Sequence, residues 1–233
     1  MKSVLALLIG FLGLPAAAQT FLVVHKKALW PDGAGELIFS EDAIEFRAAG
    51  KEQNSRKWAY GDVQHLDRVS PTELVVLSYE DQKWQLGRDR EFRFVLTEGE
   101  IGDKLFETVR SRLGRPATDR VVAEVEAPLY EIDVKHLHTF GGCEGRLLFT
   151  QTGVVYKTAH AKDAREWRMD SDVESVWSQG RYQLQIHVYE NNRREFSATR
   201  VYQFALKQRL NNEFYSNLKR RLYGLTLASD TSR

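Results

Sequence analysis

Short stretches of alternating apolar and polar residues fill the chain from Phe21 to Leu96. Alternation is clear in Ile44-Glu45-Phe46 and in Glu91-Phe92-Arg93-Phe94. A period of two is typical of strands with one buried face. Turn-forming pairs such as Asp32-Gly33 and Ser70-Pro71 separate the stretches. The pattern predicts short strands at Phe21–Trp30, Glu36–Ser40, Ile44–Ala48, Arg56–Tyr60, Val63–Val69, Leu74–Tyr79, Lys83–Gly87 and Glu91–Leu96.

A helical period follows each strand-rich region. The first apolar stripe consists of Ile101, Leu105, Phe106, Val109 and Leu113. The second has the same spacing 109 positions later and consists of Leu210, Phe214, Tyr215, Leu218 and Leu222. At about 100° per residue each set lies on one side of a helix. Gly114 and Gly224 follow directly as stop signals, so the pattern predicts two amphipathic helices that bury their stripes against the preceding strands.

The two regions are copies of one repeat. Gly35-Glu36-Leu37-Ile38-Phe39-Ser40 corresponds to Gly145-Arg146-Leu147-Leu148-Phe149-Thr150 at a displacement of 110. Other pairs recur at 109 to 111 positions, namely His25 with His136, Trp58 with Trp167, Asp62 with Asp172 and Glu80 with Glu190. We therefore expect two tandem domains, at residues 19–114 and 129–223, with a linker at 115–128 and a tail at 224–233. The expected fold is mainly β (α+β), as two barrels of about seven strands, each closed by its C-terminal helix.

This element order resembles the pleckstrin-homology (PH) superfold, particularly its GRAM-like and bacterial PH-like branches. The segment Trp58-Ala59-Tyr60-Gly61-Asp62-Val63-Gln64-His65-Leu66 is similar to the aromatic-x-x-x-Asp-[Ile/Val]-x-x-[Leu/Val] stretch of that group. A second copy, from Trp167 to Val176, fits with one extra residue. The resemblance covers both repeats and implies a fold that carries lipid-headgroup, peptide or protein binding sites.

The first 18 residues have the pattern of an export signal. Lys2 precedes an apolar run from Val4 to Leu14, and Pro15-Ala16-Ala17-Ala18 supplies small residues for cleavage. The run is shorter than the roughly 20 residues that a membrane-spanning helix needs. We expect cleavage after Ala18, which makes Gln19 the new terminus and places the protein in the periplasm or outside the cell; an uncleaved anchor is the alternative.

Charge excludes one class of partner. Removing residues 1–18 takes away one of 33 basic residues and none of 32 acidic residues, so the mature chain is neutral with histidines uncharged. Nucleic-acid binders replace phosphate counterions with a basic excess, which this chain lacks. Neutrality also disfavours electrostatic adhesion to anionic membranes, although a local basic patch is compatible with it.

No catalytic signature is present. The sequence contains no Gly-x-Ser-x-Gly, His-Glu-x-x-His, Cys-x-x-Cys or phosphate-loop motif. Gly33-Ala34-Gly35 opens a predicted strand rather than a helix, so a dinucleotide role does not fit. We expect a protein that is not an enzyme and has no cofactor.

Two histidines form a possible metal pair. His136 and His138 are two positions apart on a predicted strand, so their imidazoles lie on one face. The sequence offers no obvious third ligand, and a rim pair of ordinary surface histidines is the alternative. The chain's one cysteine, Cys143, lies in the glycine-rich run from Gly141 to Gly145, which predicts a protected thiol in a turn.

Recurring residues are assigned to structure. We expect Trp58 and Trp167 in the cores with their indole N–H groups bonded, and Asp62 and Asp172 bonded to backbone N–H groups near turns. Basic residues near the helix ends complement the helix dipoles, and these are Arg110, Arg112 and the run from Lys219 to Arg221.

Residues outside the repeat are the candidates for binding. Trp30, Trp84 and Trp177 do not recur, so they are candidate anchors of a partner surface. His25-Lys26-Lys27 is similar to the basic start of headgroup-binding PH domains, although the next loop carries Asp32 and Glu36.

Three hypotheses follow from these residues. The first is an exported, non-catalytic binding or scaffolding protein whose partner is a protein or another envelope component. The second is binding of anionic headgroups at a membrane surface through His25, Lys26 and Lys27. The third is a metal-dependent hydrolase that uses His136 and His138.

Overall fold

The architecture was obtained as a computed structural model of the 233-residue chain. It describes residues 18–27, 30–81, 89–122, 124–125, 127–190 and 199–224. The predicted signal segment up to residue 17 lies outside the described residues. So do Trp84, the predicted strand Lys83–Gly87 and the tail beyond Gly224.

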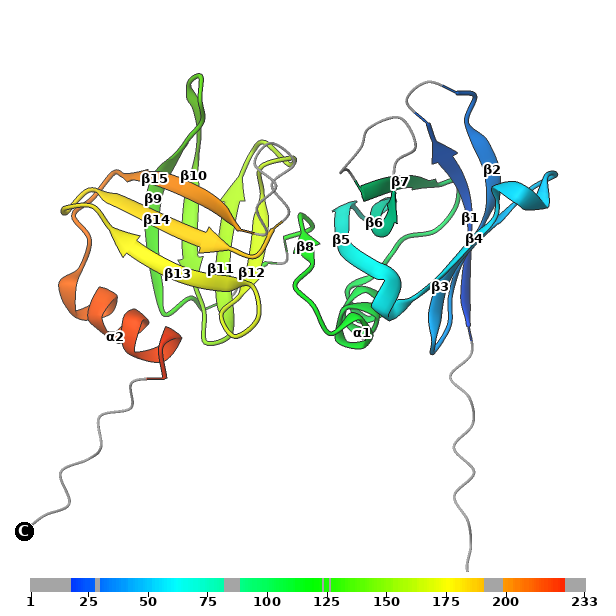
Figure 1. Cartoon of the computed structure of the whole chain (residues 1–233). Helices are drawn as coiled ribbons and strands as arrows, with labels where there is room; N and C mark the ends of the chain where they lie inside the picture. The colour runs from blue at the N-terminus through cyan, green and yellow to red at the C-terminus, as the bar shows by residue number, and fades with distance from the viewer. Residues whose placement is uncertain are drawn as a thin grey trace, which may run out of the picture.

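The first half contains seven strands and one α-helix (Figure 1). The strands are β1 (Gln19–Lys26), β2 (Gly33–Phe39), β3 (Ala43–Ala48), β4 (Arg56–Ala59), β5 (Val63–Ser70), β6 (Glu73–Asp81) and β7 (Asp89–Leu96). Two 3-10 turns, η1 (Glu52–Asn54) and η2 (Tyr60–Asp62), flank β4, and α1 (Asp103–Leu113) follows β7. Neighbouring strands pair antiparallel in the order β5-β6-β7-β1-β2-β3-β4.

The second half repeats this arrangement. Its strands are β9 (Tyr130–Leu137), β10 (Gly142–Phe149), β11 (Gly153–Thr158), β12 (Arg165–Arg168), β13 (Val173–Ser178), β14 (Gln183–Val188) and β15 (Arg200–Leu206), and α2 (Asn212–Leu222) follows. Their order is β13-β14-β15-β9-β10-β11-β12, again antiparallel. The repeat seen in the sequence is therefore a repeat of strand order.

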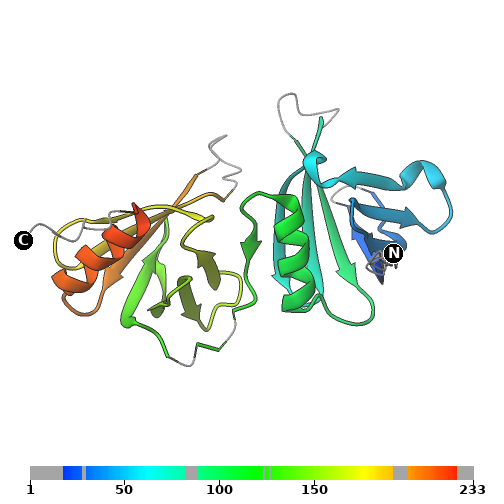
Figure 2. The ribbon, with the colours of Figure 1, turned by 90° about the horizontal axis from the view of Figure 1, so that it is seen from below.

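Neither half closes into a barrel. Among the described strands, β4 does not pair with β5, and β12 does not pair with β13. Each half is therefore a sheet that stays open between these two strands, and we call this gap the open corner. Helix α1 contacts β5 and η2, beside the open corner, and α2 contacts β13. Both helices lie on the same side of the molecule (Figure 2). The prediction of seven strands and one helix per half is confirmed, but the expected barrels are not closed by strand pairing.

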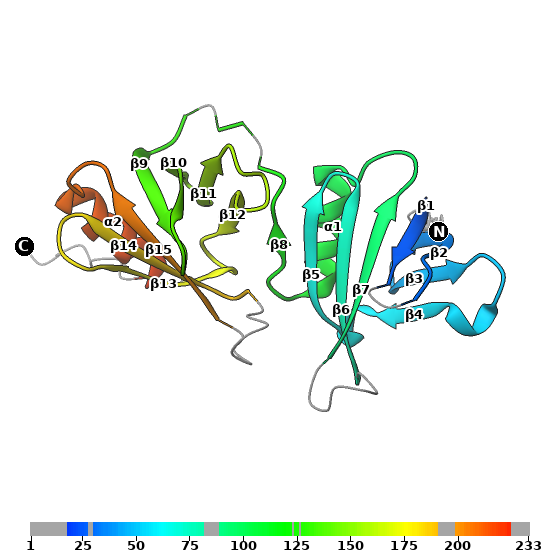
Figure 3. The same cartoon turned by 90° about the horizontal axis from the view of Figure 1, so that it is seen from above.

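A short strand in the predicted linker joins the two halves. Strand β8 (Thr118–Asp119) pairs parallel to β5 and antiparallel to β12, which makes one sheet of 15 strands (Figure 3). Thr118 and Asp119 are both buried. The sequence predicts two separate barrels; instead the segment predicted as a linker contributes backbone hydrogen bonds to both halves, which therefore share one sheet.

The apolar side chains nevertheless form two separate cores. One cluster runs from Phe21 to Ala117 and the other from Ile132 to Leu218. In α1 the predicted stripe packs into the first core, and Gly114 ends the helix with a φ of 62°, the left-handed conformation that glycine adopts without strain. In α2 Leu218 is buried, while Phe214 and Tyr215 are half-buried against the second core.

In the part of the chain that the structure describes, neither helix has the length and apolar character needed to cross a membrane.

Candidate functional site

The contact between the halves is built from buried ion pairs. Arg110 on α1 donates to the carboxylate of Asp172, and both side chains are at least 95% buried. A second buried pair joins β5 to β8. Arg68 on β5 donates to the carboxylate of Asp119 on β8 through two atoms, from Nε at 2.9 Å and from Nη2 at 2.5 Å. Arg110 was predicted to complement the helix dipole. That prediction missed its main partner, which lies 62 positions away in the sequence.

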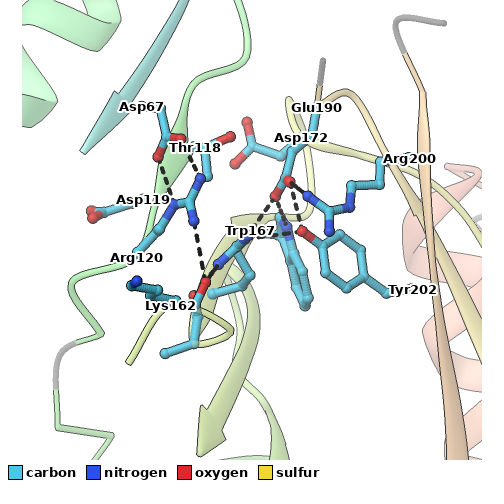
Figure 4. Close-up of polar contacts among 12 residues, drawn as sticks. Asp67, Thr118, Asp119, Arg120, Lys162, Trp167, Asp172, Glu190, Arg200 and Tyr202 are labelled. Atoms are coloured by element: carbon cyan, nitrogen blue, oxygen red, sulfur yellow. Dashed lines mark hydrogen bonds and ion pairs between the residues drawn. The ribbon is translucent and has the colours of Figure 1, made fainter. Parts of the chain in front are cut away.

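Arg120 extends this contact to both halves (Figure 4). Its Nε donates to Asp67 of β5 at 2.9 Å, and its Nη1 donates to the carbonyl oxygen of Lys162 at 3.2 Å. That same carbonyl accepts from Arg165 at 2.7 Å. Next to these groups His65 shares a 2.9 Å hydrogen bond with Thr118, and burial lowers the pKa of His65. The two halves are thus held by directional contacts, which restrict their relative motion.

Two tryptophans at repeated positions have repeated partners. Trp58 donates from Nε1 to Glu80 at 2.7 Å, and Trp167 donates to Glu190 at 2.8 Å. Both indoles lie in the cores. The sequence showed that the tryptophans and the glutamates recur, but not that they bond to each other.

The second copy of this pair carries more partners. Glu190 is buried and also accepts from the hydroxyl of Tyr202 at 2.6 Å, with Arg165 and Arg200 within 3.4 and 3.7 Å (Figure 4). Burial, together with the Glu190 charge, raises the pKa of Tyr202 above its ordinary value. Glu80 is half-exposed instead. These groups are bonded to or paired with one another, so they form one network around Glu190.

The recurring aspartates differ in the same way. Asp172 accepts from the backbone N–H of Arg168 at 2.7 Å, as predicted, and is buried. Asp62 is exposed at the end of η2. Of the two recurring aspartates, Asp172 therefore takes part in the contact between the halves, whereas Asp62 does not.

Exposed aromatic side chains mark two equivalent hairpin turns. Trp30, in the β1–β2 connection, is 75% exposed, and Phe140, in the β9–β10 turn, is 93% exposed. The two positions differ by the repeat displacement of 110. In Figure 1 both hairpins extend away from α1 and α2, toward the same side. Sequence reasoning selected Trp30 but missed Phe140, although the displacement would have found it.

The third tryptophan lies elsewhere. Trp177 on β13 is 53% exposed, donates to Ser175 at 2.9 Å, and has the ammonium of Lys219 at 5.7 Å from its ring. Its strand, β13, contacts α2, and α2 lies on the side of the second half away from the hairpin turns (Figure 1). The structure therefore does not bring Trp30 and Trp177 into one patch.

The predicted basic cluster is only partly available. His25 points into the core against Phe46, Phe92 and Phe94, at ring distances of 5.2 to 5.6 Å. Burial lowers its pKa to about 4, so it is neutral at pH 7. Lys26 pairs with Asp32 at 2.6 Å. The prediction that His25, Lys26 and Lys27 act together on an anion is wrong for His25 and is weakened by the Lys26 pair.

The two histidines at the end of β9, His136 within it and His138 just beyond it, have neighbours that the sequence did not indicate. His136 and His138 lie on one face with ring centroids 4.4 Å apart. Asp163, in the β11–β12 connection, has its Oδ2 atom 4.0 Å from Nε2 of His138 and 3.2 Å from the sulfur of Cys143. Cys143 lies in strand β10 rather than in a turn, and is the register partner of His136. The expectation of a thiol tucked into a turn is therefore wrong.

A groove lies between α2 and the start of β9. It has a volume of about 350 Å³ and is lined mainly by Leu129, Tyr130, Phe149, Phe214, Leu218 and Arg221. The rings of Tyr130 and Phe214 stack at 4.0 Å along it. This volume is at the lower end of small-ligand sites.

Comparisons with known proteins do not assign the chain to a family. No protein-family model matches the chain, and no curated protein matches it. One similar solved structure is the C-terminal domain of an unknown protein from Leishmania infantum, at 13% identity and a TM-score of 0.31, covering 42% of this chain and 84% of that one. Another is the Spt16D Pob3N heterodimer, at 10% identity and a TM-score of 0.33, covering 74% of this chain and 84% of that one. At such scores neither likeness carries an argument. The architecture of the described residues is mainly β with two α-helices.

Proposed function

We propose that the protein is an exported, non-catalytic binding protein with two PH-like modules, which hold one partner through the turns of two equivalent hairpins. The observation that carries this proposal is the pair of exposed aromatic side chains, Trp30 and Phe140, at matching positions in the connections of two hairpins that extend toward the same side. Large aromatic side chains dominate the binding energy of protein interfaces because they bury much area at little entropic cost.

The PH-like assignment is supported by strand order. Each half has seven antiparallel strands in one order, followed by a helix beside the open corner. Together with the motif from Trp58 to Leu66, this arrangement agrees with the resemblance found in the sequence.

The contact between the halves supports a single partner rather than two. Strand β8 and the Arg110–Asp172 pair hold the hairpins at a fixed separation. A rigid pair of contacts needs little ordering when the partner binds, and the second contact becomes intramolecular once the first has formed.

The test is a pull-down: immobilised mature protein (residues 19–233) is incubated with an extract of the cell envelope, and the components that it retains are measured. We expect a specific partner whose retention falls at least about tenfold in the W30A/F140A double variant, which corresponds to about 1.4 kcal/mol. Tyr182→Ala is the matched control, since Tyr182 is 56% exposed in the β13–β14 turn. Equal retention by the double variant would contradict the assigned turns, and the lack of any specific partner would contradict the binding role.

A membrane surface is the second candidate, because tryptophan and other aromatic side chains favour the membrane–water interface. Co-sedimentation with anionic and with neutral vesicles decides between the two. Binding by the parent to both vesicle types that is lost in W30A/F140A supports the membrane. If binding is lost only in K26E/K27E and only on anionic vesicles, the result supports recognition of anionic headgroups. If the parent protein does not co-sediment with either vesicle type, the membrane surface is removed as a candidate.

A further inference from the structure

Four side chains with metal-binding atoms meet at one rim of the second half. His136 and Cys143 face each other across the β9–β10 pair, and His138 lies two residues after His136, just beyond the end of β9. Asp163 comes from the β11–β12 connection. Directly opposed residues of an antiparallel pair share a face. The ring of His138 lies 4.4 Å from that of His136, so the hairpin brings three donors to one side.

The distances suit a small coordination sphere. Donor atoms of His136, His138 and Asp163 all lie within 4.8 Å of one another. The sulfur of Cys143 is 3.2 Å from Oδ2 of Asp163. In a tetrahedral zinc site, bond lengths near 2.0 to 2.3 Å separate ligand atoms by about 3.3 to 3.8 Å. Shortening the widest separation among His136, His138 and Asp163 by about 1 Å, which rotation of their side chains can supply, therefore brings these three donors to that spacing.

One donor atom lacks a hydrogen-bond partner among the residues that the structure describes. His136 is 5% exposed, and its Nδ1 atom is buried without a hydrogen bond. A neutral imidazole nitrogen without a proton offers a lone pair that can bind a metal ion. An unpaired polar atom in a core costs about 1 to 3 kcal/mol, and a ligand that it can bind would remove that penalty.

The first half shows that the fold does not require these residues. At the matching positions, displaced by 109 to 111, it has Lys27 for His138, Gly33 for Cys143 and Asn54 for Asp163. Only His25, the counterpart of His136, is kept, and it packs among phenylalanines. Two halves with the same strand order thus differ at the three positions that would complete a metal site.

We propose that His136, His138, Asp163 and Cys143 bind one divalent transition-metal ion, with Zn²⁺ as the preferred ion. Two imidazoles, a carboxylate and a thiolate are a mixed set of borderline and soft donors, which suits Zn²⁺ better than Mg²⁺ or Ca²⁺. Four protein ligands close a tetrahedral site, and closed sites are structural rather than catalytic. The ion would tie the β9–β10 hairpin, which carries Phe140, to the β11–β12 connection.

Binding has a defined proton balance. In the metal-free protein the Cys143 thiol donates a hydrogen bond to the carboxylate of Asp163. On binding, the sulfur–hydrogen bond breaks, the proton leaves to solvent, and the thiolate donates its electron pair to the ion. One proton is therefore released per ion, and no change of oxidation state is involved.

The first experiment measures metal content. Untagged mature protein is stripped with a chelator, dialysed against Zn²⁺ and assayed by elemental analysis. We expect one zinc per chain in the parent, at least a tenfold loss of affinity in His138→Ala, Cys143→Ser and Asp163→Asn, and no change in His160→Ala. His160 is an exposed histidine of the same β11–β12 connection, which makes it a matched control. Substoichiometric zinc in the parent, or retention unaffected by all three ligand variants, overturns the proposal.

The second experiment needs no variant, so misfolding cannot confuse it. Because the chain has one cysteine, its reaction with a thiol reagent reports on Cys143 alone. Saturating Zn²⁺ should slow the modification at least tenfold and release about one proton per chain, whereas Mg²⁺ should have no effect. With Co²⁺ in place of Zn²⁺, a thiolate-to-cobalt charge-transfer band should appear. An unchanged modification rate with Zn²⁺, or a cobalt spectrum without that band, removes Cys143 and overturns the four-ligand site.

Discussion

The guanidinium of Arg110, on the helix of the first half, is paired with the carboxylate of Asp172 in the second half, and water is excluded from both. Asp172 is also bonded to the backbone N–H of Arg168 and to the hydroxyl of Ser171. A buried pair of this kind adds little stability compared with apolar packing, but it penalises any geometry in which the partners separate. The pair therefore specifies how the two halves meet.

Removing one partner should be costly. Arg110→Met leaves the Asp172 charge buried without its cation, and we expect a loss of about 3 to 5 kcal/mol in the free energy of unfolding. R110M/D172N should recover part of that loss, because both charges are then gone. Urea unfolding of the single and double variants measures the coupling. Lys104→Met, at an exposed position of the same helix, is the control and should change stability by less than about 0.5 kcal/mol. A loss in R110M as small as that in K104M would contradict the role of the pair.

The two tryptophan–glutamate pairs allow a comparison within one chain. Glu190→Ala strands the indole of Trp167, the hydroxyl of Tyr202 and the nearby Arg165, all of them buried. We expect a loss of about 3 to 5 kcal/mol. Glu80→Ala should cost only about 1 kcal/mol, because its half-exposed site admits water to the indole of Trp58. Thermal or urea unfolding measures both, and equal losses would argue against the second network being the stronger.

Buried His25 should make stability depend on acidity. Burial is the largest cause that lowers the pKa of His25, and the nearby cations Lys27, Arg90 and Arg56 lower it further. Asp32 opposes them, and the net result is a pKa lowered from 6.5 to about 4. Between these values the unfolded chain binds more protons than the folded chain. The contribution of His25 is therefore complete above pH 6.5 and is lost as the pH falls toward 4.

The expected size is about 1.4 kcal/mol per pH unit below 6.5, or roughly 2 kcal/mol between pH 7.5 and 5. His25→Phe, which keeps an aromatic ring against Phe92 and Phe94, should remove this part of the dependence. Urea midpoints at pH 7.5, 6 and 5, in buffer with a chelator, measure it. An unchanged slope in H25F would refute the assignment.

Two glycines of the repeat should tolerate no side chain. A Cβ on Gly35 would meet the ring of Phe46 at 2.6 Å and the carbonyl oxygen of Arg47, and one on Gly145 would meet the ring of Tyr156 at 2.7 Å and the carbonyl oxygen of Lys157. Backbone oxygens in a sheet cannot move aside, so Gly35→Ala and Gly145→Ala should each cost about 1 to 3 kcal/mol or more.

The control for these variants is Gly61→Ala, since no atom lies within 4 Å of a Cβ at that position. It should change the free energy of unfolding by no more than about 1 kcal/mol, in either direction. Chemical unfolding of the three variants gives the comparison. Losses in G35A and G145A no larger than in G61A would show that strands β3 and β11 can shift to accommodate a methyl group.

The sequence alone determined the features that depend on neighbours along the chain. Alternation located the strands within a few residues, and a helical stripe with a following glycine located α1 and α2. The displacement of 110 positions showed two halves of like architecture, because recurring apolar positions must bury the same faces. It also paired Trp58 with Trp167, and Glu80 with Glu190, as recurring sites.

Only the tertiary structure decided what depends on the meeting of distant segments. Arg110 had the pattern of a helix-end cation and Asp172 that of a turn residue, and docking of the halves made them partners. Thr118 and Asp119 lay in a polar linker whose pairing with two sheets no local period encodes. Asp163 and Cys143, twenty residues apart, approach each other only because the β10–β11 register and the β11–β12 connection bring them to one rim. Periodicity records which face of an element is buried, whereas the partner across that face is set by the packing of the whole chain.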